Sequence, residues 1–458
     1  MPFPADFAWG AATASYQIEG AHDADGKGPS VWDAMTDWPG KVHHDDTGDI
    51  ACDHYHRLDE DVEIMRAIGL KAYRFSLSWP RIMPEGEGAV NEAGLAFYDR
   101  LVDKLLDAGV QPWATLFHWD YPLALYRRGG WLNPKAPEWF ATYAEVVVDR
   151  LSDRVTNWMT LNEPQCFIGH GHYIGAHAPG LKLDWPDVLL ANHHALMAHG
   201  RAVAVIREKA RAAPSVGWAP VGVIKYPFQN DPRHVDAARE AMFAITDRHP
   251  WNNTWYSDPV VFGHYPEDGL RVFGETVPRF DPADMKVIQQ PIDFYGANIY
   301  NGLGVKTGDA GEPVEDPRQP GFARTLFDWP IEPDSLYWGP RFLHERYGLP
   351  IVITENGMSA HDWVHLDGEV HDPHRIDFTA RYLRRLGDAI DDGIPVTGYM
   401  HWSLMDNFEW AHGYRHRFGL TYVDFTTRER TIKQSGHWYR RVIESHGEAL
   451  HAAPYATA

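Results

Sequence analysis

The feature that most constrains the fold of this chain is a repeated alternation between short apolar runs and longer amphipathic stretches. The short runs are rich in β-branched and aromatic residues, and the stretches between them carry apolar residues at helical spacing. Such alternation is typical of a parallel sheet whose strands are joined by crossover helices. Candidate helices include residues 53–68, 92–108, 137–153 and 375–391. The eight candidate strands are residues 8–14, 72–77, 111–117, 156–161, 221–226, 293–299, 351–354 and 396–402.

The eight alternations favour one closed barrel over several domains. The chain has 458 residues, which at ~150 residues per domain would allow about three domains. However, no Ser/Gly-rich linker, charge run or shift in composition separates the alternations. The predicted fold class is therefore α/β, as a single (β/α)8 TIM barrel with extended βα loops over residues 1–458. A doubly wound sheet is the alternative, but the chain lacks the G-x-G-x-x-G and G-x-x-x-x-G-K-[ST] phosphate loops of nucleotide chemistry.

Charge and cysteine content exclude several kinds of partner. The chain carries 63 acidic and 42 basic residues, a net charge of −21 that would repel a nucleic-acid backbone or an anionic membrane. No run reaches the ~18 apolar residues of a membrane span, and the N-terminal sequence does not resemble a secretory signal. Cys52 and Cys166 are expected to be reduced thiols. We therefore expect a cytoplasmic protein without nucleic-acid or membrane partners, whose oligomeric state the sequence leaves open.

Polar and aromatic residues gather at the ends of the candidate strands, where a barrel collects its βα loops. The motifs there are FHWDYP, TLNEP, ANIYN, ITENG and YMHWSLMDNFEW. Two of them carry a glutamate flanked by Asn and by Pro or Gly, Glu163 in TLNEP and Glu355 in ITENG, on strands that face each other across an eight-stranded barrel. Hydrolysis of an acetal needs two carboxyl groups, one to protonate the leaving oxygen and one to stabilise or capture the oxocarbenium-like centre. The alternative is that each glutamate only caps the next helix.

The tryptophans near the last strand suggest a surface that binds a sugar. Trp402, Glu409 and Trp410 lie together in HWSLMDNFEW. A pyranose packs its C–H face on an indole, and its hydroxyls need polar partners. Core packing is the alternative for any single tryptophan, but it explains less well a cluster with Glu and Asn. This segment is therefore a candidate carbohydrate-binding wall.

Taken together, these motifs resemble those of glycoside hydrolase family 1, whose members are enzymes of the β-glucosidase type. The resemblance extends from FAWGAATASYQIEG near the start to IKQSGHWYRRVI near the end. It implies hydrolysis of terminal non-reducing β-D-glucosyl residues from β-glucosides and short oligosaccharides, with galactosyl and fucosyl residues left open. The motifs that carry it, in order, are YRFSLSWPRI, TLFHWDYP, TLNEP, ITENG and WSLMDNFEWAHGY.

The resemblance also implies a role for each matched residue. Glu163 would be the general acid/base and Glu355 the nucleophile, with Arg74 of YRFS as the cation that supports the nucleophile. The residues implied to bind the substrate are Gln17, His118, Asn162, Trp402, Glu409 and Trp410 at the glycone, Asn298 and Tyr300 near the nucleophile, and Trp329 beside the aglycone.

These roles predict a retaining double displacement. Arg74 would favour the ionised form of Glu355, whose charge would keep Glu163 protonated until the glycosyl-enzyme forms. Glu163 would then act as the base for the incoming water. The two carboxyl groups should lie ~5–5.5 Å apart. Glu409, interpreted as an acidic residue at the rim, and Phe418 predict sugars that are not phosphorylated.

No cofactor and no metal are expected for this chemistry. The 26 histidines form several close pairs, but none has the H-E-x-x-H or Cys/His spacing of a zinc site. The expected partner is a small-molecule β-glycoside. Two other functions stay open, a transglycosidase of the same fold and a catalytically silent sugar-binding barrel. The presence of both Glu163 and Glu355 disfavours the silent barrel.

Overall fold

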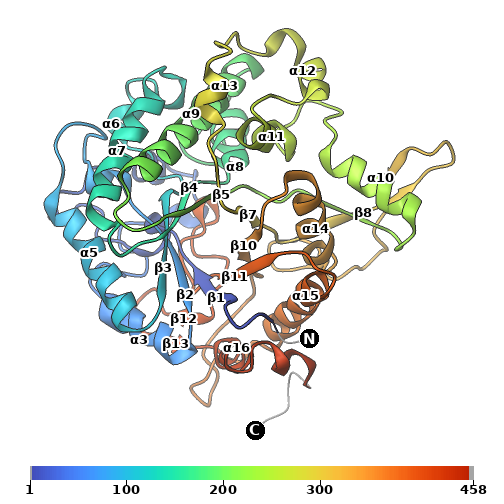
Figure 1. Cartoon of the computed structure of the whole chain (residues 1–458). Helices are drawn as coiled ribbons and strands as arrows, with labels where there is room; N and C mark the ends of the chain where they lie inside the picture. Colours follow the sequence, from blue (N-terminus) through green and yellow to red (C-terminus); the bar gives the residue numbers. More distant parts are fainter. Residues whose placement is uncertain (1–2, 453–458) are drawn as a thin grey trace.

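The computed structural model describes residues 3–452, which contain eight parallel strands arranged as a nearly closed barrel with helices around it (Figure 1). The predicted (β/α)8 fold class is confirmed. The ends of the predicted domain, residues 1–2 and 453–458, lie outside the described residues. In the order in which they neighbour one another, the barrel strands are β5 (Ser215–Ala219), β4 (Asn157–Asn162), β3 (Gln111–Phe117), β2 (Ala72–Ser76), β1 (Ala8–Ala12), β11 (Val396–Trp402), β10 (Ile351–Asn356) and β7 (Tyr295–Asn298).

Strands β5 and β7 meet where the barrel closes. The backbone N–H of Asp293 donates to Val216 O at 2.7 Å, and that of Asn298 donates to Pro220 O at 3.0 Å. Gly296 permits the close approach, because a Cβ atom there would lie 2.3 Å from the carbonyl oxygen of Trp218. Closure of the barrel therefore depends on the absence of a side chain at this position.

The fifth strand is the one that the sequence prediction placed wrongly. Residues 221–226 were expected in the barrel, whereas β5 is formed by Ser215–Ala219. Gly217 faces the ring of Phe294, where a Cβ would lie 2.5 Å from the ring, so packing selects a residue with low strand propensity. The more apolar run contributes β6 (Ile224–Pro227), which pairs with β8 (Gly302–Thr307) in a separate three-stranded sheet.

Smaller strands lie outside the barrel. Strand β8 also pairs with β9 (Pro313–Glu315), and this hairpin projects beside α10 on the right of Figure 1. Strands β12 (Thr421–Val423) and β13 (Arg430–Ile432) form an antiparallel pair near the C-terminal helix. These additions lengthen the connections between barrel strands without changing the barrel.

The helices agree with the predicted ones to within a few residues, except that the helix expected at 53–68 begins only at Leu58. It ends at Gly69, whose φ of 77° gives the left-handed conformation that favours glycine. The helices are α1 (Ser15–Ile18), α2 (Val31–Thr36), α3 (Leu58–Ile68), α4 (Trp79–Ile82), α5 (Glu92–Asp107), α6 (Leu123–Tyr126), α7 (Ala136–Leu151), α8 (Pro164–Ile168), α9 (Trp185–Lys209), α10 (Pro232–Phe243), α11 (Thr254–Phe262), α12 (Glu267–Phe273), α13 (Asp284–Ile288), α14 (Ser335–Tyr347), α15 (Pro373–Asp391) and α16 (Gln434–Glu444).

Large side chains fill the inside of the barrel. Trp113 packs edge-on against Phe294 with ring centroids 5.5 Å apart, and Met400 and Val352 are buried in the same cluster. This cluster blocks the barrel axis. The space for a ligand therefore lies above it, at the carboxyl ends of the strands.

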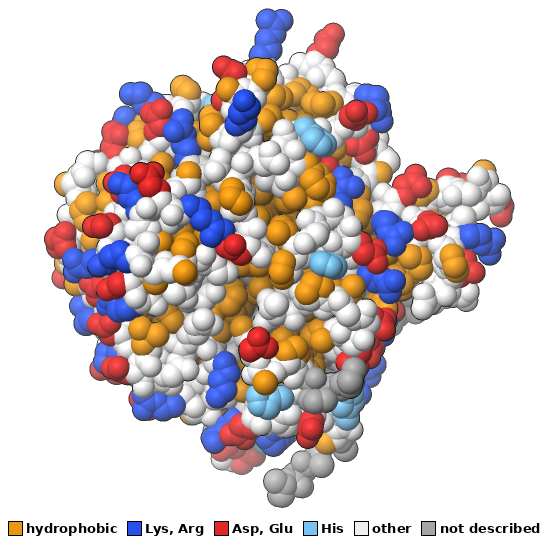
Figure 2. Space-filling view, in the orientation of Figure 1, with side chains coloured by type: hydrophobic (Ala, Val, Ile, Leu, Met, Phe, Trp, Pro, Cys, Tyr) orange, Lys and Arg blue, Asp and Glu red, His pale blue; other side chains and the backbone are white. Residues whose placement is uncertain are grey.

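The surface carries charges of both signs. Figure 2 shows acidic and basic side chains mixed over the face drawn, with apolar side chains between them. Within residues 3–452, no helix has the length and apolar character needed to cross a membrane. Cys52 and Cys166 are both buried as free thiols.

Candidate active site

A cavity of about 740 Å³ opens at the carboxyl ends of the barrel strands. This volume lies in the range of small-molecule sites. Three of the predicted residues, Gln17, Arg74 and Asn162, lie behind the cavity wall and support it through hydrogen bonds. The other predicted residues line the cavity itself: His118, Glu163, Asn298, Tyr300, Trp329, Glu355, Trp402, Glu409 and Trp410.

Glu355 lies within β10, and donors hold both of its carboxylate oxygens. Arg74 Nη1 donates to Oε1 at 2.6 Å, and Tyr300 Oη donates to Oε2 at 2.7 Å. Arg74 is itself buried on β2, where its Nη1 also donates to the carbonyl oxygen of Thr354. Charge-assisted bonds of this kind orient a carboxylate strongly. The Glu355 carboxylate is thus fixed in the wall of the cavity.

Glu163 follows β4 in an unusual backbone conformation, with φ of 46° and ψ of 67°. It occupies the N-cap position of α8, but its side chain makes no capping hydrogen bond. Its Oε1 instead accepts a bond of 2.9 Å from Asn298 Nδ2 on β7. Since Glu355 lies inside a strand, the alternative that these glutamates serve as helix caps fails for both.

Asn162 connects the two glutamates. Its Oδ1 accepts from Arg74 Nη2 at 2.6 Å and from Asn298 Nδ2 at 2.9 Å. Arg74 bonds Glu355, and Asn298 bonds Glu163, so one hydrogen-bonded chain joins both carboxyl groups. The chain draws residues from β2, β4, β7 and β10, which are far apart in the sequence.

The two glutamates have different electrostatic environments. Burial, followed by the charge of Glu355, raises the pKa of Glu163 to about 7. Burial also raises the pKa of Glu355 above its ordinary value, although Arg74 and the hydrogen bond from Tyr300 act in the opposite direction. Only Glu355 has a cation bonded to its carboxylate. This arrangement favours a proton on Glu163 and a charge on Glu355.

Aromatic rings form the wall beside these glutamates. His118 stacks against Trp402 and Trp410, with ring centroids 5.8 and 5.9 Å apart. Burial and the nearby Arg74 lower the pKa of His118 well below its ordinary value, so the ring is neutral. Its Nε2 lies 3.0 Å from Asn162 Nδ2, which joins the ring to the hydrogen-bonded chain. The wall therefore combines flat apolar surface with oriented polar groups.

Glu409 was interpreted from the sequence as an acidic residue at the rim that repels phosphate, and the structure gives it a different environment. It is half-buried in the cavity wall, and burial with the charges of Glu355 and Glu163 raises its pKa to about 8. Its Oε2 is buried without a hydrogen-bond partner among the described residues. At neutral pH the free side chain is therefore mostly protonated, and it can both donate to and accept from a hydroxyl group.

Gln17 holds the segment that carries Glu409. Its Nε2 donates to Asn407 Oδ1 at 3.0 Å and to the carbonyl oxygen of Phe408 at 2.9 Å. Gln17 is fully buried and does not line the cavity. Its amide nitrogen thus supports the wall.

The family model for glycosyl hydrolase family 1 matches residues 1–448. The chain belongs to this family. Beta-glucosidase A of Thermotoga maritima is 44% identical over 97% of this chain and 98% of its own length. The 1,4-beta-D-glucan glucohydrolase of Thermotoga neapolitana is 43% identical over 97% of this chain and 99% of its own. The solved structure of the Thermotoga maritima beta-glucosidase in complex with glucoimidazole superposes with a TM-score of 0.89, at 43% identity and with 97% and 99% of the two chains covered.

In this member of glycosyl hydrolase family 1, the outer part of the cavity contains one predicted residue and several that the sequence prediction missed. The predicted residue is Trp329, which packs on Phe327 with ring centroids 4.4 Å apart. Trp119 is in the FHWDYP motif, and its indole nitrogen donates to Asn162 O at 2.9 Å, so the motif could have indicated it. Trp251 lies in a loop and His170 in the π-helical segment Gly169–Ile174 after α8, neither within such a motif, and their ring centroids lie 4.7 Å apart. Only the fold reveals these two as lining residues.

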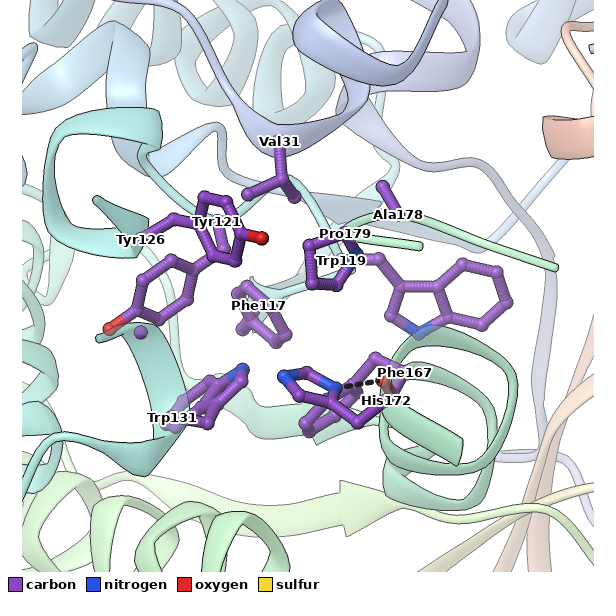
Figure 3. A pocket seen from close by; sticks show the side chains of 11 residues that line it. Val31, Phe117, Trp119, Tyr121, Tyr126, Trp131, Phe167, His172, Ala178 and Pro179 are labelled. Atoms are coloured by element: carbon purple, nitrogen blue, oxygen red, sulfur yellow. Dashed lines mark hydrogen bonds between the residues drawn. The ribbon is translucent and has the colours of Figure 1, made fainter. Parts of the chain in front are cut away.

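A second, much smaller cavity lies behind Trp119 (Figure 3). Its volume of about 10 Å³ has room for about one water molecule and none for a sugar. Figure 3 shows it enclosed by aromatic rings and by His172, whose Nδ1 bonds the carbonyl oxygen of Phe167 at 2.8 Å. The candidate active site is therefore the cavity of about 740 Å³, which Glu163 and Glu355 line.

Proposed function

We propose that this protein is a retaining β-glycosidase that removes terminal non-reducing β-D-glucosyl residues from β-glucosides and short oligosaccharides. The observation that carries the proposal is the hydrogen-bonded chain through Arg74, Asn162 and Asn298, which joins two buried glutamates that line the cavity. The relatives named beta-glucosidase and glucan glucohydrolase support the same substrate class.

In the first step, Glu355 attacks the anomeric carbon while Glu163 gives its proton to the leaving oxygen. The bond from carbon to the leaving group breaks as the ester bond to Glu355 forms. The charge on Glu355 is favoured by Arg74, and the proton on Glu163 by its raised pKa. The leaving group departs as an alcohol, and a glycosyl-enzyme remains.

In the second step, water replaces the sugar on Glu355. Esterification has removed the negative charge of Glu355, which is the second largest cause of the raised pKa of Glu163. Glu163 then ionises more readily and takes a proton from the attacking water. The product keeps the β configuration, because two displacements at the same carbon cancel each other.

The cavity wall is proposed to hold the glucosyl residue. Trp402 and Trp410 offer surfaces for the C–H faces of the ring, and Glu409 faces the cavity as a partner for free hydroxyls, including the 6-hydroxyl. Asn162 is expected to bond the 2-hydroxyl, an interaction that strengthens in the transition state and raises turnover, and to do so its buried amide has to turn from His118 toward the cavity. Trp329 lies beside the aglycone. We expect no cofactor or metal to take part.

A panel of aryl β-glycosides tests the proposal. Wild-type protein should release the aryl group, the Glu355→Ala variant should lose nearly all turnover, and a Glu145→Ala variant at a surface ion pair should behave as wild type. Equal turnover by wild type and Glu355→Ala would refute the assignment, and no turnover by wild type would favour the silent sugar-binding barrel. The ranking of glucosides, galactosides and fucosides determines the glycone preference.

Two further measurements separate the remaining alternatives. NMR of the first sugar released should show the β anomer, whereas the α anomer would mean an inverting enzyme. The ratio of free sugar to transfer product in the presence of added alcohols distinguishes a hydrolase from a transglycosidase. That residues 1–458 act as one catalytic domain in the cytoplasm stays part of the proposal, to be tested by limited proteolysis and cell fractionation.

A further inference from the structure

A buried network of charged side chains lies directly behind the segment that carries Glu409 and Trp410. Three carboxylates and three cations form it, so the network is neutral overall. Its members, which we call the ion network, are Asp362, Asp372, Asp406, Arg375, Arg417 and Lys433. All six side chains are shielded from solvent except that of Arg417, which is 16% exposed.

Lys433 is the centre of the ion network. Its Nζ donates to Asp362 Oδ2 at 2.6 Å and to Asp406 Oδ1 at 2.6 Å. Asp362 belongs to the loop after β10, the strand that contains Glu355. Asp406 belongs to the loop after β11. Lys433 is the last residue of the connection that leads from β11 to α16, and Asp406 lies near the start of that connection. One side chain therefore ties the loop after β10 to both ends of the connection after β11.

The loop after β11 connects Asp406 of the ion network to Glu409 in the cavity wall. Asp406 also accepts from Arg417 Nη1 at 2.7 Å and from the backbone N–H of Gly419 at 3.0 Å, so its side chain is held from three directions. The next residue, Asn407, donates to Ser403 Oγ at 2.9 Å and accepts from Gln17. Glu409 follows two residues later, and its backbone N–H donates to Gly413 O at 2.7 Å.

A buried ion network is weak evidence for stability, because desolvation of the charges offsets much of their attraction and apolar replacements of similar volume are often equally stable. What charged groups add is direction, since each bond fixes both a distance and an angle. The bonds around Asp406 fix the start of the segment that ends in Glu409 and Trp410. We propose that Lys433 is a positioning residue for the glucosyl site, acting through Asp406, an inference that rests on the proposed function.

The test removes Lys433 without leaving an unpaired charge. Lys433→Met alone leaves an excess of buried carboxylate and is expected to lower stability, so the informative variant is Lys433→Met with Asp362→Asn. This pair leaves the ion network neutral, and the amide at position 362 can still accept from Arg375. The matched control is Arg346→Met with Asp258→Asn, which removes an ion pair of 2.6 Å between α14 and α11, away from the cavity.

Both double variants are assayed with 4-nitrophenyl β-D-glucoside and with its 6-deoxy analogue. If Lys433 positions Glu409, the KM for the glucoside should rise ~10-fold in the Lys433→Met/Asp362→Asn variant, about the value of one hydrogen bond, with a smaller change in kcat. The preference in kcat/KM for the glucoside over the 6-deoxy analogue should fall by a similar factor. The control should keep the wild-type KM and the wild-type preference.

A third variant, Arg417→Met, tests the proposal if the Lys433→Met/Asp362→Asn variant does not fold. Arg417→Met removes a partly exposed partner of Asp406 and should shift the KM and the preference in the same direction, by a smaller factor. Wild-type values of both quantities in every variant that folds would overturn the proposal and leave the ion network a purely structural role. If wild-type protein hydrolysed neither substrate, the proposed function itself would fail, which is a separate result.

Discussion

Replacement of Tyr300 by Phe should move the pH profile of the enzyme without changing its fold. Tyr300 Oη donates to Glu355 Oε2 at 2.7 Å, and this bond favours the ionised carboxylate. A hydrogen bond to a charged group contributes ~1.5–3 kcal/mol, and one pKa unit corresponds to ~1.4 kcal/mol. Loss of the bond should therefore raise the pKa of Glu355 by ~1–2 units, less if water enters the space left by the hydroxyl.

The sign of the change in activity follows from the role of Glu355. A nucleophile must be ionised, so activity is present above the pKa of Glu355 and is lost as the pH falls through it. A raised pKa moves the acidic limb of the kcat/KM profile to higher pH, while the basic limb, assigned to Glu163, should move much less. The assay is kcat/KM for an aryl β-glucoside measured from pH 4 to pH 9.

The matched control is Tyr226→Phe. Tyr226 Oη donates to Glu332 Oε2 at 2.6 Å, which is the same type of bond at a position outside the cavity wall. This variant should keep the wild-type pH profile. An acidic limb that stays in place in Tyr300→Phe, with the loss of rate uniform across pH, would refute the argument that Tyr300 tunes the charge of Glu355.

Two further predictions concern the acid and the barrel. Since the pKa of Glu163 is about 7, kcat/KM should fall as the pH rises through about 7. In Glu163→Gln this basic limb should disappear, with ~10²–10⁴-fold slower cleavage of alkyl glucosides and a smaller loss for dinitrophenyl glucosides; equal losses for both would contradict the acid role. Gly296→Ala should lower the free energy of unfolding by ~1–3 kcal/mol, because its Cβ would clash with the carbonyl oxygen of Trp218. Thermal melting checks this against Gly387→Ala in α15, where the nearest atom outside the helix lies at 3.5 Å and no loss is expected.

The barrel could be predicted from the sequence because its signal is periodic and local. Each barrel strand except the fifth falls on a predicted run, and the helices between them end within a few residues of the expected positions. The fifth strand failed because its residues are chosen for tertiary packing. Gly217 makes way for Phe294, so the segment does not carry the β-branched pattern by which strands are recognised.

The residues of the candidate site could be found where motifs end on strands. Glu163 and Glu355 are of this kind, as are Trp402 and Glu409. Trp251 could not be found in this way, because a loop residue reaches the cavity only through the path of the chain in space. The sequence also could not distinguish the cavity wall from its support.

The sequence by itself determined the eightfold alternation, the family and the two glutamates, since these depend on residue type and order along the chain. Only the tertiary structure decided the electrostatics of the site. The pKa of Glu409 rises to about 8 because burial and the charges of Glu163 and Glu355 act on it together. Burial and charge proximity are properties of distance in space, and residues more than 50 positions apart in the sequence, such as Glu355 and Glu409, acquire them only when the barrel closes.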